Sequence, residues 1–284
     1  MGTLLGLGAA LFWGIGDFAI TTLARYVGSA RSLLYIQVFS LLSWIALIAV
    51  FPFDIKGGIN PWLLAALAGA FHVAGLVTTY RAFEVGTLSF VSPIASSFAI
   101  VTALIFVLTG SAPPVLALLG TLLLVLGIVV VTKSTANQGP VTLKGVPEAV
   151  ASAVCFGVMF WMFGAFVEHS LGYVYPLILL KVMATSYAAA YAATSKEKPA
   201  EKPPAGGKLA LIAFTAAALD SLAWVCYLLA TAKSHSAVVT ALASLFSVVT
   251  VVLAGIFLKE RLNKLQWVGV AVVLAGILLV SLQS

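Results

Sequence analysis

The sequence predicts an all-α integral membrane protein with ten transmembrane helices, arranged as two inverted five-helix repeats. Hydrophobic residues make up 62% of the 284 residues and charged residues only 8%, whereas a soluble domain carries roughly a quarter of charged residues. The apolar residues form continuous runs of about twenty, the length of a helix that crosses ~30 Å of hydrocarbon. Because backbone groups in lipid must bond internally, and because these runs do not alternate in polarity, helices are favoured over a barrel.

Ten apolar spans follow one another along the chain, and most connections between them are short. The first run has no basic segment before it and is long enough to span, so we expect a membrane helix there and no cleaved signal peptide. The longest connections are 132–145 and 194–207, and the second, rich in Lys, Glu, Pro and Gly, is expected to be a solvated loop. The expected spans are 3–23, 32–51, 61–83, 89–108, 115–131, 146–167, 173–193, 208–230, 236–258 and 265–282.

Patterns in the first half of the chain recur about 145 residues later. The fifth and tenth spans share a Gly-x6-Gly-Ile pattern, and serines spaced by eight mark both the fourth and the ninth span. The matching positions are Gly120, Gly127 with Gly269, Gly276; Ser89, Ser97 with Ser236, Ser244; Tyr80 with Tyr227; and Gly14 with Gly157. Five spans per half is an odd number, so the second half must enter the membrane from the opposite side, as in many secondary transporters. We therefore expect repeats at 1–134 and 146–284, a linker at 135–145, and a substrate site between the repeats.

The loop charges predict the orientation of the chain. Of the fourteen Lys and Arg residues in the loops or at the adjoining ends of spans, twelve fall at odd-numbered loops, and only Lys56 and Lys233 fall at even-numbered ones. The positive-inside rule then places both termini outside the cytoplasm. Basic loops of this kind orient a membrane protein, and they account for the net charge of +6. No nucleic-acid partner is therefore expected.

Four ionisable residues lie deep within the expected spans: Asp17, His72, Lys181 and Asp220. Burial in a membrane is costly for such groups, so each is a candidate for function. Polar and aromatic residues share their helical faces, which predicts a substrate cavity lined by Trp13, Asp17, His72, Thr79, Tyr80, Ser97, Trp161, Lys181, Asp220, Trp224, Tyr227 and Ser244. One lysine and one or two aspartates would hold the two ends of a zwitterion. The alternatives are a helix-to-helix ion pair made by Lys181, or proton coupling.

Other residues in the spans have two interpretations each. The Ser and Thr rows of the fourth and ninth spans either bind substrate or allow close helix packing. Pro93 is a hinge candidate or an ordinary kink. Cys155 and Cys226 lie in apolar runs and are expected to be free thiols, with neither a disulfide nor a metal site. Because no enzyme or nucleotide-binding motif is present, we expect no catalytic residues and no cofactor.

The last loop and span carry a family resemblance. The chain reads Leu258-Lys259-Glu260-Arg261-Leu262 and then Gln266-Trp267-Val268-Gly269, with Ala275-Gly276 further on. This is similar to the ending of EamA domains in the drug/metabolite transporter superfamily, and Trp13-Gly14 resembles their opening. Two departures are Thr240, where such domains often have proline, and Thr109-Gly110, which has no acid matching Glu260. The resemblance implies two EamA-like copies that form a ten-helix carrier, most similar to bacterial exporters of amino acids, including aromatic ones.

The resulting hypothesis is an exporter of aromatic or apolar amino acids and related metabolites that works by alternating access. It would be a monomer in a bacterial inner membrane with periplasmic termini, with only its solute and the lipid bilayer as partners. The rival within transport is a proton-coupled multidrug exporter in which Asp17 is the proton-linked acid. The rival outside transport is a membrane sensor or scaffold. That rival needs a soluble output domain, and none of the expected loops is large enough to be one.

Overall fold

The computed structural model describes residues 2–50, 57–109, 143–195, 207–233, 236–258 and 264–281, with isolated positions between 119 and 130. Every element in these ranges is a helix. Seven described helices are long and apolar enough to cross a membrane, and two shorter apolar helices follow at Leu242–Leu258 and Trp267–Gly276. The expected spans other than the fifth therefore contain a helix, while the fifth, 115–131, lies almost entirely outside the described residues.

The helices follow the predicted order. The first half contains α1 (Gly2–Val27), α2 (Ser29–Val50), α3 (Ile59–Val85), α4 (Leu88–Ala95) and α5 (Phe98–Leu108). In the second half, α7 (Val146–Met162) continues through a π-helical turn, Phe163–Val167, into α8 (Glu168–Leu171). The remaining helices are α9 (Val174–Thr194), α10 (Lys208–Thr231), α11 (Ser236–Ser244), α12 (Phe246–Leu253) with a π-helical turn at Ala254–Leu258, and α13 (Lys264–Ser281).

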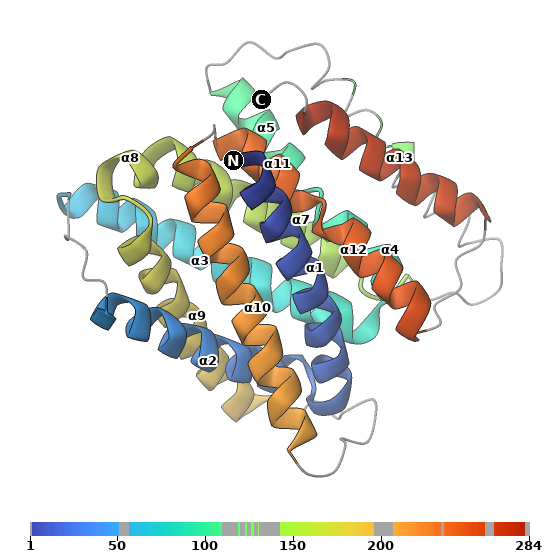
Figure 1. Ribbon diagram of the computed structural model, residues 1–284, viewed down its shortest axis with the longest axis horizontal. Helices are drawn as coiled ribbons and strands as arrows, with labels where there is room; N and C mark the ends of the chain where they lie inside the picture. Colours follow the sequence, from blue (N-terminus) through green and yellow to red (C-terminus); the bar gives the residue numbers. More distant parts are fainter. Residues whose placement is uncertain are drawn as a thin grey trace.

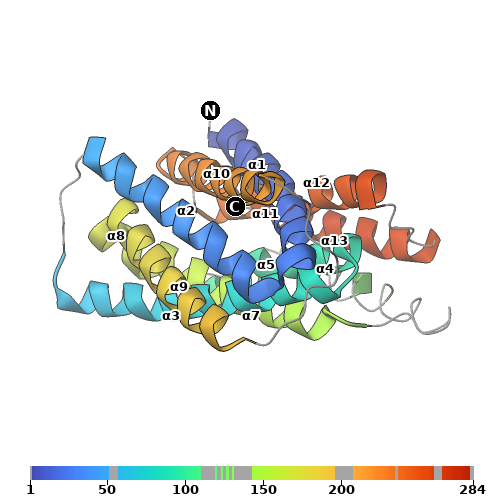
Figure 2. The same cartoon turned by 90° about the horizontal axis from the view of Figure 1, so that it is seen from below.

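Long-range packing joins helices from different halves of the chain. The most extensive contact is between α1 and α10, followed by that between α3 and α7, and α2 packs on α9. Figure 1 shows α1 and α10 side by side, and Figure 2 shows α3 and α7 on the other side of the bundle. Helices α1 and α3 of the first half are therefore covered mainly by α10 and α7 of the second half.

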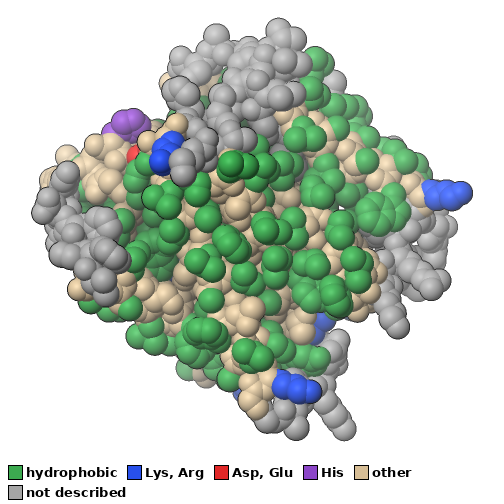
Figure 3. Space-filling view, viewed as in Figure 1, with side chains coloured by type: hydrophobic (Ala, Val, Ile, Leu, Met, Phe, Trp, Pro, Cys, Tyr) green, Lys and Arg blue, Asp and Glu red, His purple; other side chains and the backbone are tan. Residues whose placement is uncertain are grey.

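The outer face of the bundle is apolar. Hydrophobic side chains cover most of the face in Figure 3, and the Lys and Arg side chains visible there lie toward its edges. Large apolar side chains are exposed on several helices, among them Leu4, Leu63, Leu211, Phe214, Ile256 and Phe257. Soluble monomers rarely expose such continuous apolar surface. Together with the seven apolar spans, this surface supports a multi-pass membrane protein.

Two of the expected spans are broken into two helices. The fourth span breaks between α4 and α5 at Ser96–Ser97, three residues after Pro93, and the ninth breaks between α11 and α12 at Leu245. At both breaks a backbone amide bonds three residues back: Ser97 to Ile94 at 3.1 Å and Leu245 to Leu242 at 3.2 Å. The ninth span contains no proline, so a break of this kind does not require one.

Glycine permits two close contacts next to these breaks. A Cβ on Gly14 of α1 would lie 2.7 Å from the carbonyl oxygen of Phe246, at the start of α12. A Cβ on Gly157 of α7 would lie 3.0 Å from the carbonyl oxygen of Phe98, at the start of α5. Each glycine thus lets the first helix of one half approach the broken span of the other half.

Candidate functional site

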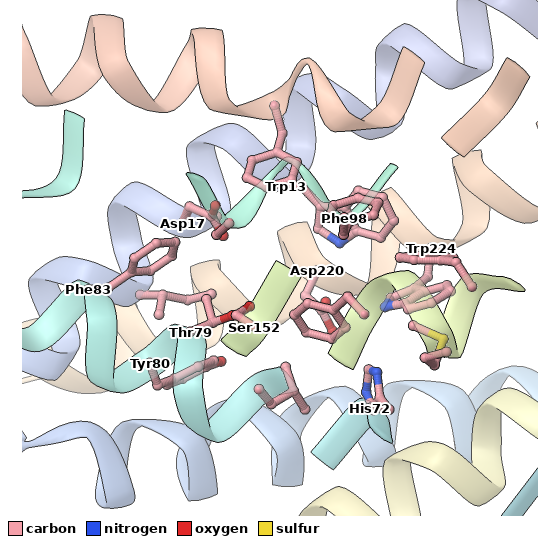
Figure 4. Close-up of a pocket in the computed structure, with 18 of the residues that line it drawn as sticks. Trp13, Asp17, His72, Thr79, Tyr80, Phe83, Phe98, Ser152, Asp220 and Trp224 are labelled. Carbon is pink, nitrogen blue, oxygen red and sulfur yellow. The ribbon is translucent and has the colours of Figure 1, made fainter. Parts of the chain in front are cut away.

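A cavity of about 90 Å³ lies at the centre of the bundle, with room for several water molecules or part of a small solute. It lies between α1, α2, α3, α7, α10 and the two broken spans (Figure 4). Its lining consists of Trp13, Gly16, Asp17, Ile20, Gln37, His72, Leu76, Thr79, Tyr80, Phe83, Ala95, Phe98, Ser152, Phe156, Met159, Phe160, Asp220, Trp224 and Phe246. Most of these side chains are apolar, and the polar ones are few.

Aromatic rings form one wall of the cavity. The rings of Trp13 and Trp224 meet edge to face with centroids 5.4 Å apart. The rings of Phe98 and Phe246 are stacked with centroids 6.2 Å apart, and Phe98 also stacks on Phe160 at 5.0 Å. Such a wall offers a large apolar surface, and its ring faces attract cations.

An ion pair lies beside the cavity. The Nζ atom of Lys181 on α9 is 2.6 Å from Oδ2 of Asp220 on α10, and the lysine side chain is fully buried. The hydroxyl of Ser40 on α2 donates to the same oxygen at 3.0 Å. Lys181 Nζ also lies 5.9 Å from the ring centroid of Trp224. Asp220 therefore connects α10 to both α9 and α2, and Lys181 does not line the cavity.

Three polar side chains of the cavity have atoms without a hydrogen-bond partner in the described part of the chain: Oδ2 of Asp17, Oε1 of Gln37 and both ring nitrogens of His72. Asp17 is buried on α1 and faces the cavity (Figure 4), and its Oδ2 atom has no partner in the described part of the chain. His72 is 2% exposed, and neither ring nitrogen has a partner among the described residues. The imidazole packs against the rings of Phe156 and Trp224, with centroids 5.8 and 6.1 Å away. Unpaired buried polar groups are costly, so these atoms are available to a solute.

Thr79, Tyr80 and Ser152 contribute hydroxyl groups to the cavity. The hydroxyls of Thr79 on α3 and Ser152 on α7 share a hydrogen bond. The Tyr80 hydroxyl, on the next residue of α3, interacts with the side chain of Gln37 on α2. These pairs connect the third span to the sixth and to the second, and they place hydroxyl groups along the cavity.

The structure brings seven of the predicted site residues together at the cavity: Trp13, Asp17, His72, Thr79, Tyr80, Asp220 and Trp224. The other predicted residues lie outside the lining. Tyr227 packs behind Trp224 and hydrogen-bonds Thr240 at 2.7 Å, so it does not face Tyr80 across the cavity as its repeat position predicts.

Four more predicted residues are engaged elsewhere. Trp161 contacts Phe166 with ring centroids 5.4 Å apart, and the Ser97 hydroxyl donates to the carbonyl of Ile94 in its own span at 2.6 Å. Ser244 is fully buried, and Pro93 is buried within α4. These positions follow the close-packing interpretation of the serine rows more closely than the substrate-binding one.

Several lining residues were not predicted. Phe98 and Phe246 are the first residues of α5 and α12, directly after the two helix breaks, and Phe156 is the repeat equivalent of Trp13 in the register that pairs Gly14 with Gly157. That register could have identified Phe156 from the sequence. Gln37 of the second span also lines the cavity. It was not predicted because its side chain is not ionisable.

In the described ranges, no group of three or more His, Cys, Asp or Glu side chains is arranged to hold a metal ion. Cys155 and Cys226 are both free and half-buried.

Comparisons with known proteins agree with this architecture. Residues 143–282, about the second half of the chain, match the EamA-like transporter family. A solved crystal structure, described only as that of a protein, has a similar fold with a TM-score of 0.68 at 16% sequence identity; the match covers 99% of this chain and 96% of that one. No curated protein matches the sequence. The family match supports a membrane transporter of the drug/metabolite transporter superfamily.

Proposed function

We propose that the chain transports amino acids with aromatic or apolar side chains across the membrane, through the central cavity. The observation that carries the proposal is an aromatic wall beside buried polar atoms that lack a partner among the described residues, in particular Oδ2 of Asp17 and the ring nitrogens of His72. A carboxylate accepts hydrogen bonds from an ammonium group, and an imidazole N–H donates to a carboxylate. The wall of Trp13, Trp224 and Phe98 provides the apolar surface for the side chain.

Transport would proceed by alternating access between two inverted repeats, 1–134 and 146–284. Equivalent contacts in the two halves support this plan. The hydroxyl of Thr250 donates to the Gly14 carbonyl at 3.2 Å, and that of Thr102 donates to the Gly157 carbonyl at 3.0 Å. The broken spans meet at the stacked rings of Phe98 and Phe246, so a change at one break bears directly on the other. Pro93 would serve as part of the hinge in the first repeat.

The test is counterflow in proteoliposomes. Liposomes loaded with unlabelled L-phenylalanine and containing the protein should accumulate external labelled L-phenylalanine transiently, because a carrier exchanges solute on both sides of the membrane. Protein-free liposomes and liposomes loaded with glucose are the controls. Absence of counterflow for every apolar amino acid tested would exclude the proposal. Accumulation that follows a pH gradient, and that Asp17→Asn abolishes, would instead favour the proton-coupled multidrug exporter.

The orientation of the chain is a separate expectation. If the basic loops face the cytoplasm, both termini lie on the opposite side of the membrane, which is the periplasm if the host is bacterial. A reporter that is active only outside the cytoplasm, fused after Ser284, should therefore be active. The same reporter inserted after Lys202, in the loop between α9 and α10, should be silent and serves as the control. A silent reporter after Ser284 together with an active reporter after Lys202 would reverse the assignment.

A further inference from the structure

We propose that the cavity recognises its solute by the amine, through Asp17, and that it therefore also binds arylalkylamines that carry no carboxylate. The inference rests on the proposed transport function and names the substrate class of the same site. It depends on three features of the cavity: the charge balance among its ionisable groups, the position of Asp17 relative to the aromatic wall, and the hydrogen-bonding groups that remain for a carboxylate.

The charge balance leaves Asp17 without a counter-ion. Lys181 is bonded to Asp220 at 2.6 Å and is fully buried, so it is not available to pair with Asp17 or with the carboxylate of a solute. The other polar groups that line the cavity are His72, Thr79 and Tyr80 from α3, Gln37 from α2, Ser152 from α7 and Asp220 from α10. None of these is a permanent cation. A carboxylate buried in such a site needs a cation or a proton, and the ammonium group of a solute meets this need.

The position of Asp17 directs the rest of the solute onto the aromatic wall. Asp17 lies four residues after Trp13 on α1, so the two side chains lie on one face of the helix, and both line the cavity (Figure 4). Trp224 meets Trp13 edge to face, and Phe98 and Phe246 continue the wall. An ammonium group at Asp17 would therefore place its carbon chain and an aryl group against rings that favour both apolar contact and positive charge.

The hydrogen-bonding groups make the carboxylate of the solute an optional feature, because they are neutral. The described cavity offers it the unpartnered N–H of His72 and the one O–H donor that the shared hydrogen bond of Thr79 and Ser152 does not use. A neutral donor contributes less than an ion pair between complementary charges. Loss of the carboxylate should therefore weaken binding far less than loss of the amine.

Three probes with the same phenyl ring and two-carbon chain separate these contributions: L-phenylalanine, 2-phenylethylamine and 3-phenylpropionate. Binding of each to the detergent-purified full chain is measured by titration calorimetry. We expect 2-phenylethylamine to bind about as tightly as L-phenylalanine, and 3-phenylpropionate to bind roughly tenfold more weakly or not at all. In Asp17→Asn, the affinity for both amine-bearing probes should fall roughly tenfold to a hundredfold.

Three further variants complete the test. His72→Phe should weaken the binding of L-phenylalanine and leave the binding of 2-phenylethylamine unchanged. Asp17→Glu keeps the carboxylate and should retain amine binding; it replaces Asp17→Asn in the test if that variant does not fold. Glu148→Gln removes a carboxylate in the first turn of α7, outside the cavity lining, and should change neither affinity. Binding of L-phenylalanine without binding of 2-phenylethylamine, or amine binding that survives Asp17→Asn, would overturn the inference and leave amino acid transport intact. Binding of 2-phenylethylamine without binding of L-phenylalanine would uphold recognition of the amine and exclude the amino acid proposal.

Discussion

The Lys181→Met variant is expected to lose about 3–5 kcal/mol of stability, the loss typical when one partner of a buried ion pair is removed. The substitution leaves Asp220 with the Ser40 hydroxyl as its remaining hydrogen-bond partner of those found in the structure. Unfolding of the purified protein in mixed micelles, followed by tryptophan fluorescence, measures the effect. Lys181→Met combined with Asp220→Leu should recover most of the loss, because an apolar pair of similar volume often replaces a buried ion pair without cost.

The control for this effect is an ion pair near the surface. Nη1 of Arg81 lies 2.8 Å from Oε2 of Glu84 at the end of α3; the arginine side chain is 43% exposed and the glutamate side chain 6%. Arg81→Met should lower stability by about 1 kcal/mol, less than Lys181→Met, because the arginine is partly solvated and Glu84 keeps the Ser29 amide as a donor at 3.3 Å. If Lys181→Met were no more destabilising than Arg81→Met, the ion pair would not brace the three helices, and Lys181 would return as a candidate for solute binding.

Trp224→Ala is expected to reduce transport of L-phenylalanine much more than transport of L-alanine, because lost contact area scales with the side chain of the solute. One aromatic contact is worth roughly 1–3 kcal/mol, or on the order of tenfold to a hundredfold in affinity. Trp224 meets Trp13 and His72 at the cavity and is 4% exposed. The concentration dependence of counterflow, measured for both amino acids in parallel, gives the ratio of phenylalanine to alanine transport. Tyr80→Ala should shift it in the same direction.

Trp161→Ala is the matched control for Trp224→Ala. Trp161 is a half-buried tryptophan on α7 that contacts Phe166 and does not line the cavity. Its removal should leave the ratio of phenylalanine to alanine transport unchanged. Equal losses for both amino acids in Trp224→Ala would indicate a folding or gating defect. Normal transport of both by a well-expressed Trp224→Ala protein would show that this residue does not line the path.

The helices could be predicted from sequence because each membrane span is specified locally, by an apolar run of sufficient length. The runs at α1, α2, α9 and α10 coincide with helices in the structure. The end of α1 was placed too early, at Leu23, because the helix continues beyond the apolar run, through Arg25 to Val27, and ends before Gly28, whose φ is 86°. The break at Leu245 could not be predicted, because no proline or glycine marks it in the sequence.

The polar part of the site could be predicted and the aromatic part only in part. Asp17, His72 and Asp220 are conspicuous because ionisable groups are rare in membrane spans. Phenylalanine is compatible with lipid, with a helix interface and with a cavity, and the chain has seventeen of them. Their number concealed Phe98 and Phe160. Tyr227 was assigned to the cavity by its spacing from Asp220, but the rings of Trp13 and Phe160 pack over it, and only tertiary structure decides such a contact.

The exchange of helices between the halves has a consequence for biosynthesis. The main packing surface of α1 is provided by α10, which begins about 180 residues after α1 ends. At a synthesis rate of about 5–20 residues per second, α1 resides in the membrane for roughly 10–40 s before that surface is complete. During this time Asp17 lacks its final neighbours. A ribosome that stalls between the two halves would therefore leave α1 with a carboxyl group that is not yet buried in the bundle.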